Sequence, residues 1–390
     1  MSNAKTVYLD HAATSYPKPP AVLSAVTECM KHSGGNPGRG SHRLALAAAK
    51  EIYACREAAA RMFGAEPDRV IFTLNTTHAL NLAIKGIMGQ SDYAGGQAGG
   101  HALCSDMEHN SVYRPLYRLA KDGIMDFDVF DTFPTATTRT DDRILSSMVT
   151  KLRPDTKAVV CAHASNICSA TLPIAKIGSL CRRMGIRFIV DAAQSAGAMN
   201  IDVDRMNIDV LCLPGHKGLM GPQGTGMLIL GKGITLDTLM EGGNGMDSLR
   251  GDMSVDTPER YEPGTLQTPA IAGLRAGLKF VESVGVETIG AHEKRLGSKL
   301  RDRLLELPKV TVYAPRHEGG VVLFSVDGYT SDEVGRILDT EGICARTGFH
   351  CSALGHRTLR TPDGGAVRAS FGWGSRERDV EALLKVVKKL

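Results

Sequence analysis

The sequence lacks any apolar run long enough to cross a membrane as a helix, which takes about 18 consecutive apolar residues. Its N-terminal segment has no apolar signal core either. The net charge is only +4, and the basic residues are spread along the chain rather than gathered in one arm. We therefore expect a soluble protein whose main partner is neither a nucleic acid nor a membrane.

Disulfide and zinc patterns are missing as well. The nine cysteines are an odd number and include no CxxC pair. Most lie in apolar segments such as Val159-Val160-Cys161, which is typical of reduced, buried thiols in the cytoplasm. Cys351 is the exception, because it ends the segment Thr347-Gly348-Phe349-His350-Cys351 among glycines and histidines. Its surroundings single it out for chemistry.

What is present is an alternation of short apolar runs and helical segments over 390 residues, enough for two domains. This alternation predicts an α/β fold whose mainly parallel sheet is covered on both faces. The glycine-rich segment 89–100 is typical of a surface loop. Strands are expected at 70–73, 101–104, 158–161, 187–190, 210–213 and 226–230, and helices at 21–31, 43–63, 77–88, 144–152 and 174–184.

The pattern changes across 241–268, which is rich in glycine and proline and has little periodicity. We take this segment as the way out of a large domain at 16–245. A smaller α+β domain is expected at 246–390, together with an N-terminal arm at 1–15. Its elements are helices at 270–284 and 286–307, strands at 310–312 and 321–324, and a terminal helix from Ser375.

Ligands of such folds bind outside the carboxyl ends of the strands, so the residues that follow each strand are candidates for a site. Thr76 and Thr77 open a helix after the first strand, where backbone N–H groups can bind a phosphate. Threonines also cap ordinary helices, so this pattern alone leaves both interpretations open. His109 follows the next strand and either stacks on a planar cofactor or caps a loop.

Asp191 ends an apolar run, so its carboxylate is expected deep in the sheet, where it needs a cation such as a protonated pyridine nitrogen. Capping of the following helix is the alternative. Lys217 follows a strand in a glycine-rich turn, well placed to enter a cleft and form an imine with an aldehyde cofactor. The glycines around it match neither GxGxxG nor a Walker P-loop, which disfavours a nucleotide.

Four motifs follow one another along the chain: Glu108-His109-Asn110, Asp191-Ala192-Ala193-Gln194, Gly215-His216-Lys217 and Arg346-Thr347-Gly348-Phe349-His350-Cys351. In this order they resemble class V aminotransferase-fold enzymes that use pyridoxal 5′-phosphate (PLP), above all the cysteine desulfurase/selenocysteine lyase family. The resemblance extends from Leu9-Asp10-His11-Ala12-Ala13-Thr14 to the C-terminus. It implies PLP-dependent transferase fold type I, in which a large domain with a mainly parallel mixed sheet is followed by a smaller C-terminal α+β domain.

The resemblance also implies roles for individual residues. Lys217 would be the Schiff-base lysine and proton shuttle, Asp191 would pair with the pyridinium nitrogen, and Cys351 would attack the sulfur of L-cysteine. The products would be L-alanine and a Cys351 persulfide for a sulfur-acceptor protein. Arg346, His350 and His356 lie near Cys351 in the sequence and, as basic neighbours, would lower the pKa of its thiol. The other implied residues are His109 against the ring, Gln194 at its hydroxyl, Thr76, Thr77 and His216 at the phosphate with Thr265 from the second subunit of a homodimer, and Asn166, Arg346 and Arg368 for the substrate.

Several alternatives stay open. Selenocysteine lyase, another C–S lyase and a class V aminotransferase share the same lysine and aspartate. A metal-dependent hydrolase would use His350, Cys351 and His356, but Cys-x4-His is a loose spacing without a carboxylate cluster, so no metal is expected. Three positions depart from the family pattern and bear on the substrate: Pro214, Gly38 and His78.

Overall fold

The computed structural model describes residues 6–38, 42–89, 99–132, 140–314 and 318–390. Its largest feature is a seven-stranded sheet. Neighbouring strands are parallel from β7 to β4, whereas β8 runs antiparallel to both β7 and β2. The predicted mainly parallel mixed sheet is therefore confirmed. In spatial order the strands are β2 (Val70–Thr73), β8 (Gly226–Leu230), β7 (Val210–Pro214), β6 (Arg187–Asp191), β5 (Thr156–Ala162), β3 (His101–Ser105) and β4 (Asp126–Phe130).

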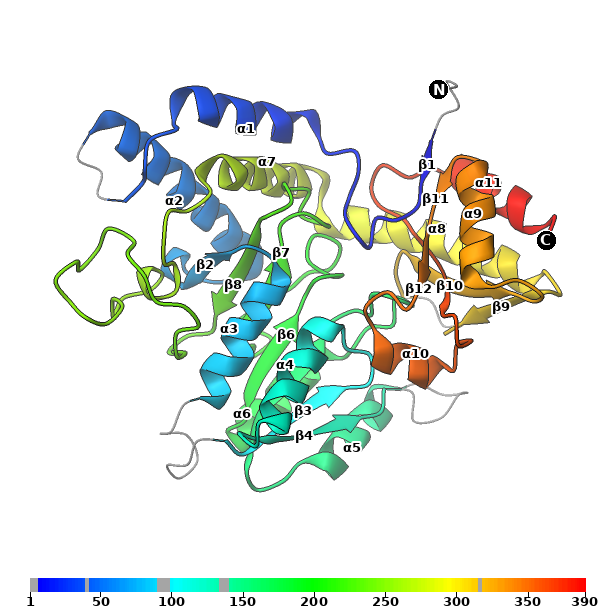
Figure 1. Cartoon of the computed structure of the whole chain (residues 1–390), viewed down its shortest axis with the longest axis horizontal. Coiled ribbons are helices and arrows are strands. Elements are labelled where there is room, and N and C mark those ends of the chain that lie inside the picture. Colours follow the sequence, from blue (N-terminus) through cyan, green and yellow to red (C-terminus); the bar gives the residue numbers. More distant parts are fainter. Residues whose placement is uncertain (1–5, 39–41, 90–98, 133–139, 315–317) are drawn as a thin grey trace.

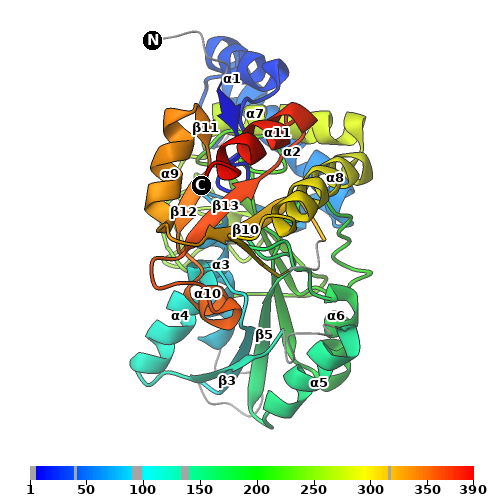
Figure 2. The same cartoon turned by 90° about the vertical axis from the view of Figure 1, so that its right-hand side faces the viewer.

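Helices cover both faces of this sheet, as Figures 1 and 2 show. Successive residues of a strand point to opposite faces. In β5, Val159 and Cys161 accordingly belong to one apolar core, while Ala158 and Val160 belong to the other. The first core is closed by α2 (Arg43–Phe63), α5 (Asp141–Lys151), α6 (Ile174–Met184) and α7 (Thr268–Val284), and the second by α3 (Thr76–Met88) and α4 (Asn110–Lys121).

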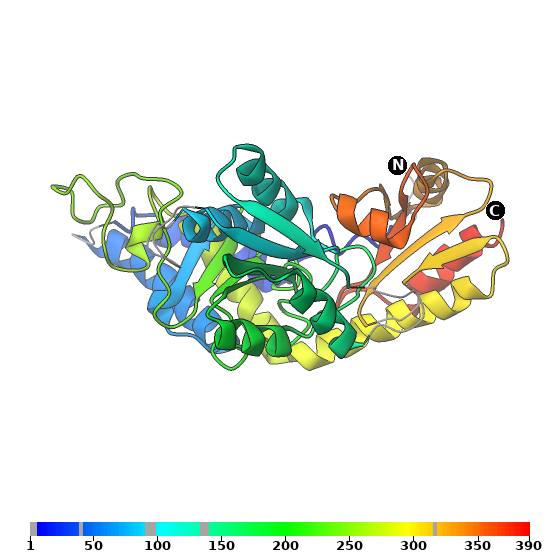
Figure 3. The ribbon, with the colours of Figure 1, turned by 90° about the horizontal axis from the view of Figure 1, so that it is seen from below.

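A smaller four-stranded antiparallel sheet lies beside the large one (Figure 3), with the order β12 (Arg346–Gly348), β13 (Ala366–Ser370), β10 (Val321–Val326) and β9 (Val310–Tyr313). Its core also takes residues from α8 (Val286–Leu305), α9 (Ser331–Thr340) and α11 (Glu377–Val387). The N-terminal arm joins this part, because β1 (Val7–Tyr8) pairs in parallel with β11 (Ile343–Cys344). The smaller α+β unit is therefore present.

The predicted domain limits stay predictions. Helix α7 lies beyond the proposed boundary at 245, yet it packs against α1 (Pro20–His32) and α2 and contributes Ile271 and Leu274 to a core of the large sheet. At Gly285 (φ 92°) the chain turns into α8, which reaches the small sheet. A boundary at this glycine would agree better with the packing.

Most predicted elements match the observed ones within a few residues. In the large unit two were missed, α4 and β4, and in the smaller unit the prediction contained no element at α9, β11, β12, α10 (Ala353–Leu359) or β13. Helix α4 contains Pro115, which lacks a donor for the helix ladder. Strand β4 is an edge strand with the sequence Asp-Phe-Asp-Val-Phe. Its polar and apolar residues alternate at first, so it lacks the short apolar run by which the other strands were predicted. Nine residues of the predicted loop at 89–100, namely 90–98, lie outside the described residues.

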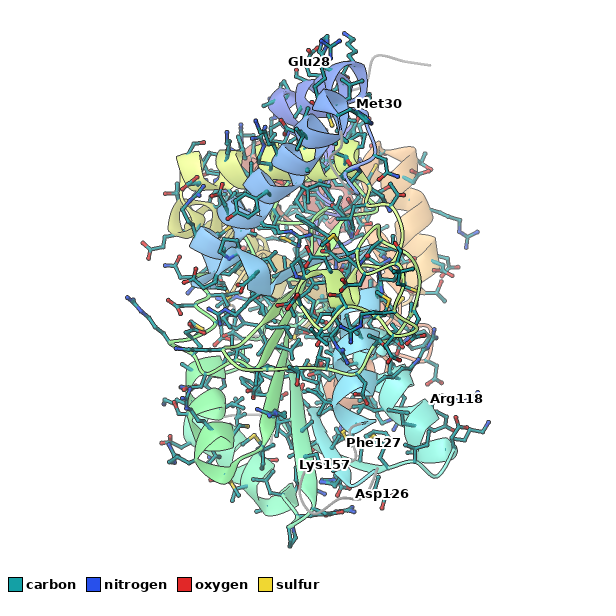
Figure 4. The ribbon with its side chains drawn as sticks, turned by 90° about the vertical axis from the view of Figure 1, so that its left-hand side faces the viewer. Glu28, Met30, Arg118, Asp126, Phe127 and Lys157 are labelled. Atoms are coloured by element: carbon teal, nitrogen blue, oxygen red, sulfur yellow. The ribbon has the colours of Figure 1, made fainter. Side chains whose placement is uncertain are left out.

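The carboxyl ends of three central strands lie in line. Ala162 pairs with Asp191, and Asp191 pairs with Cys212 in β7, so the segments after β5, β6 and β7 leave the sheet together. Figure 4 shows Glu28 and Met30 of α1 at one end of the molecule and Asp126 and Phe127 of β4 near the other. Within the described ranges, no helix has the length and apolar character needed to span a membrane.

Candidate active site

Lys217 lies in the turn after β7, where positions 215 and 218 have room only for glycine. A Cβ on Gly215 would come within 2.1 Å of Thr225 Oγ1, and one on Gly218 within 2.2 Å of the carbonyl oxygen of Ala196. The N-terminal arm closes over this turn, because Ser15 Oγ donates a hydrogen bond to the carbonyl of Lys217. The close packing therefore fixes the path of the backbone at Lys217.

Burial lowers the pKa of Lys217 to about 8, and the nearby Arg368 and Arg346 act in the same direction. Asp191 opposes them. An amine with this pKa is partly uncharged near neutral pH, and the uncharged amine is the form that attacks a carbonyl carbon. Lys217 is thus chemically suited to form a covalent bond with an aldehyde.

Asp191 ends β6, as predicted, and is 4% exposed. One carboxylate oxygen accepts a hydrogen bond of 2.9 Å from the N–H of Ala193. Burial raises the pKa of Asp191, while this hydrogen bond and Lys217 limit the rise. The side chain therefore caps the next turn, not a helix as the alternative from the sequence assumed, and it faces the cavity as a desolvated acid that a cation would stabilise.

A cavity of about 220 Å³ brings the predicted site residues together. Cys351 and Thr265 are the two predicted residues that do not line it. Those that do are Thr76, Thr77, His109, Asn166, Asp191, Gln194, His216, Lys217, Arg346 and Arg368.

The N-terminus of α3 forms one end of the cavity. Asn75 caps the helix by accepting the N–H of His78 at 2.9 Å, which leaves Thr76 and Thr77 as the first helical residues. Thr77 Oγ1 lies 2.7 Å from Ser111 Oγ, a residue that the sequence did not single out. Helix N-termini bind anions through their N–H groups, so this end suits a phosphate.

His109 carries out one of the two roles between which the sequence could not decide, and the other, stacking on a planar cofactor, stays a prediction. Its Nδ1 accepts the N–H of Ser111 at 3.0 Å and so caps α4, and its ring lines the cavity. Burial lowers the pKa of His109 to about 4, with Lys217 and Arg346 adding to the shift. The imidazole is therefore neutral, as suits a ring that stacks on a planar group.

The N-terminal arm also holds the other polar residues near Lys217. His216 Nδ1 lies 3.0 Å from Thr14 Oγ1, and Gln194 Nε2 donates to the carbonyl of Ala12 at 3.0 Å. Burial lowers the pKa of His216 to about 4, so it too is neutral. The motif that opens the resemblance is thus part of the wall of the site.

Arg368 and Arg346 are cross-strand neighbours in the small sheet and both face the cavity. They differ in their partners. The Arg368 guanidinium is 2% exposed and donates to the carbonyl of Asn166 at 3.0 Å and to Asp10 Oδ1 at 2.6 Å. Within the described part of the chain, the guanidinium of Arg346 makes no hydrogen bond. Asp10 was missed as a site residue, although its motif was part of the resemblance.

Cys351 is exposed and directly follows His350, which lines the cavity. The N–H of Asn110, the first residue of α4, donates to the Cys351 carbonyl at 2.7 Å, and Asn166 Nδ2 donates to the carbonyl of His350 at 2.8 Å. These bonds dock the loop of the small unit that precedes α10 (Ala353–Leu359) onto the large unit, at the start of α4 and at Asn166. Asn110 was quoted in a motif, but its contact with Cys351 was not foreseen.

One expectation about Cys351 needs correction. We expected His350 and His356 to provide positive charge near the thiol. Burial lowers their pKa values to about 3 and about 4, and Arg368 adds to both shifts. Both rings are therefore neutral, and the cations on this side of the cavity are Arg346 and Arg368.

The same two histidines belong to the metal-site alternative. In the structure their rings hydrogen-bond to each other at 3.1 Å. Over the residues whose positions are described, no group of three or more His, Cys, Asp or Glu side chains is arranged to hold a metal ion. The geometry of this pair therefore lends the metal alternative no support.

Thr265 lies away from the cavity of its own chain, where Asn36 Nδ2 donates to its hydroxyl at 3.3 Å. Gly38 is in the same region, and a Cβ there would lie 3.0 Å from the carbonyl oxygen of Asn244, so the loop would have to shift for a histidine. His78 Nδ1 accepts the N–H of Leu74 within the first turn of α3. Pro214 is the last residue of β7.

The comparisons with known proteins agree with one another. The family model of class-V aminotransferases matches residues 7–383. A probable cysteine desulfurase of Methanothermobacter thermautotrophicus is 31% identical and covers 98% of this chain and 94% of its own length. A probable cysteine desulfurase of Pyrococcus abyssi is 32% identical, with 99% and 94% covered. The apo structure of a cysteine desulfurase from Thermococcus onnurineus superposes with a TM-score of 0.87 at 30% identity, covering 98% of this chain and 94% of that one.

The model of the class V aminotransferase family matches nearly the whole chain, so the protein belongs to this family. The fold and the lysine after β7 agree with this assignment. Within that class, the identity and coverage of its relatives show that the chain belongs to the cysteine desulfurase family. The resemblance carried by the four sequence motifs is thereby confirmed.

Proposed function

We propose that this protein is a PLP-dependent cysteine desulfurase, which converts L-cysteine to L-alanine and keeps the sulfur as a persulfide on Cys351. The observation that carries the proposal is the joint placement of three groups. Lys217 and Asp191 line one cavity, and Cys351 directly follows His350 of its lining and is docked through the N–H of Asn110. The names of the relatives support the same activity.

The residues of the cavity fit PLP. Asp191 is a buried carboxylate whose raised pKa marks a site that lacks a full counter-charge, as a protonated ring nitrogen would provide. Thr76, Thr77 and His216 would hold the phosphate, His109 would cover the ring, and Gln194 would bind its hydroxyl. When bound, PLP supplies an electron sink for the Cα carbon of an amino acid.

The protein's own groups would carry out the remaining steps. Arg346, Arg368 and Asn166 would bind the substrate carboxylate, and Lys217 would move the proton at Cα. The Cys351 thiolate would attack the substrate sulfur, so that an S–S bond forms while the Cβ–S bond breaks. The electron pair of that bond stays with carbon, which takes up a proton and becomes the methyl group of alanine.

The second subunit and the acceptor are part of the proposal. Thr265 would reach the phosphate of a partner copy, which accounts for its distance from the cavity of its own chain. The exposure of Cys351 would let an acceptor thiol remove the persulfide sulfur. Among the described residues the nine cysteines form no disulfide, which supports a reducing compartment such as the cytoplasm.

The decisive test is the release of alanine and sulfide from L-cysteine by the purified protein, with and without a reductant that discharges the persulfide. Cys351→Ser should keep PLP but lose activity by about 1,000-fold or more, as for removal of other catalytic nucleophiles. Cys344→Ser, at the partly buried cysteine of β11, is the matched control and should stay active.

Other outcomes identify the alternatives. If Cys351→Ser releases sulfide as fast as the wild type, the nucleophile lies elsewhere. Activity on selenocysteine that survives in Cys351→Ser would indicate a lyase for that substrate, because selenium leaves more readily than sulfur. Keto-acid formation without alanine would indicate an aminotransferase.

A further inference from the structure

Two histidines to which the proposed reaction assigns no role lie next to Cys351. His350 and His356 are 4% and 3% exposed. Their rings lie within 10° of parallel, with centroids 5.3 Å apart, and His350 Nδ1 lies 3.1 Å from His356 Nε2. The chain of contacts continues at both ends, because His350 Nε2 is 3.3 Å from the Arg346 carbonyl oxygen and His356 Nδ1 is 2.8 Å from Thr361 Oγ1.

Every hydrogen in this chain has a defined place. A carbonyl oxygen can only accept, so His350 Nε2 carries the hydrogen and donates to Arg346. Because His350 is neutral, its Nδ1 accepts, and His356 Nε2 must donate to it. His356 is neutral as well, so its Nδ1 accepts the hydroxyl hydrogen of Thr361. All four ring nitrogens are thereby engaged.

This arrangement decides between two possible roles. A general base for the thiol would need a ring nitrogen with an open lone pair directed at sulfur, and neither histidine has one while the chain is intact. What the chain can do is hold the backbone. His350 (φ 50°) and Cys351 (φ 55°) both adopt left-handed conformations, which side chains other than glycine persist in only when their surroundings hold them.

We propose that Arg346, His350, His356 and Thr361 form a histidine relay that positions Cys351 for attack on the substrate sulfur. The relay ties the nucleophile loop to β12, the strand that carries Arg346. It therefore fixes the separation between the nucleophile and a group that holds the substrate carboxylate. Asn110 and Asn166 donate to the backbone carbonyls of Cys351 and His350, respectively. The relay holds the side chain of His350. This inference rests on the proposed desulfurase reaction.

The test compares His356→Phe, which keeps an aromatic ring but loses both hydrogen bonds, with His356→Gln, which keeps a donor toward His350. For His356→Phe, kcat for alanine formation should fall by about 100-fold, because small displacements of a reacting group cost about that much. KM for L-cysteine and the absorbance of bound PLP should not change. His356→Gln should recover to within about fivefold of the wild type.

Two further variants complete the series. Thr361→Val removes the last donor of the relay and should lower kcat by about threefold, in line with one neutral hydrogen bond. It also serves as the test if His356→Phe does not fold. His292→Phe is the matched control, because His292 has one hydrogen bond to the Ser375 carbonyl and an edge contact with Trp373 in the small unit. Its kcat should equal that of the wild type.

The outcomes separate this inference from the proposed function. If the wild type releases no alanine, or Cys351→Ser is fully active, the proposed function fails before the relay is tested. If those controls behave as expected but His356→Phe matches His292→Phe, the relay has no positioning role. A change confined to KM or to PLP retention would also overturn it, because a general structural defect would explain that result.

Discussion

Lys217 lines the cavity and Cys351 follows His350 of its lining, but the two residues are held in different ways. Lys217 and Asp191 follow neighbouring parallel strands of one sheet, where backbone pairing sets their relative position. Cys351 lies in a loop of the smaller unit, and it reaches the site through single hydrogen bonds from Asn110 and Asn166. The half of the site built for the cofactor therefore depends on sheet register, whereas the half built for the nucleophile depends on contacts between two units.

The largest effect should follow from removing the group at the centre of the first half. Lys217→Ala should abolish both activity and the covalent retention of PLP after borohydride reduction, because no other lysine lines the 220 Å³ cavity among the residues described. Absorbance near ~420 nm, expected for lysine-bound PLP, should disappear. Lys176→Ala, at a surface ion pair with Asp141, is the control. Covalent retention by the Lys217 variant would show that another amine carries the cofactor.

The pKa of Lys217 adds a pH dependence to this prediction. Because burial lowers it to about 8, the fraction of uncharged amine rises as pH approaches 8 and levels off above it. The rate at which apoprotein binds PLP covalently should follow the same curve. If the rate of covalent PLP binding does not change between about pH 6 and pH 9, a range that includes this pKa, the prediction is wrong.

A comparison of Arg346 with Arg368 separates the binding of the substrate from the stability of the fold. Arg346→Ala should raise KM for L-cysteine by about tenfold, the value of one charge-assisted hydrogen bond, with little change in stability. Arg368→Ala should in addition destabilise the fold by about 3–5 kcal/mol, because it leaves Asp10 without its partner beside a buried cavity. Kinetics and urea unfolding measure the two effects, with exposed Arg357→Ala as the control. Equal stability of both variants would show that the Asp10 pair is weak.

The smallest effect on activity is expected at Glu108, which precedes His109 in the chain and is 0% exposed. Burial raises its pKa to about 8 from 4.5, so the folded protein keeps this proton while the unfolded chain loses it above pH 4.5. The protonated Glu108 side chain therefore contributes its full stabilisation to the wild type below pH 4.5, and this contribution is lost as pH rises through about 8.

Glu108→Gln removes that dependence. Its stability relative to the wild type should improve between pH 5 and pH 8, on the order of 1–3 kcal/mol, while activity stays nearly unchanged. Thermal unfolding at the two pH values measures this difference. If the stability difference between Glu108→Gln and the wild type is the same at both pH values, Glu108 does not titrate between them.

The sequence was most informative where a residue follows a strand. Asp191, Lys217 and Thr76 each stand at the end of an apolar run or a few residues after it, and the rule for carboxyl ends of parallel strands was enough to bring them to one cavity. It was least informative for partners from distant segments. Asp10 meets Arg368 across 358 positions, and Ser111 meets Thr77 across 34. No local pattern marks such pairs.

The order of motifs along the chain by itself determined the family, the fold class and the lysine and cysteine that carry the proposed reaction. It could do so because local periodicity and short motifs reflect backbone geometry close in sequence. Only the tertiary structure decided that His350 and His356 are neutral and engaged with each other, and that Asp10 occupies the guanidinium of Arg368. Protonation and pairing depend on burial, and burial arises only when separate segments pack together.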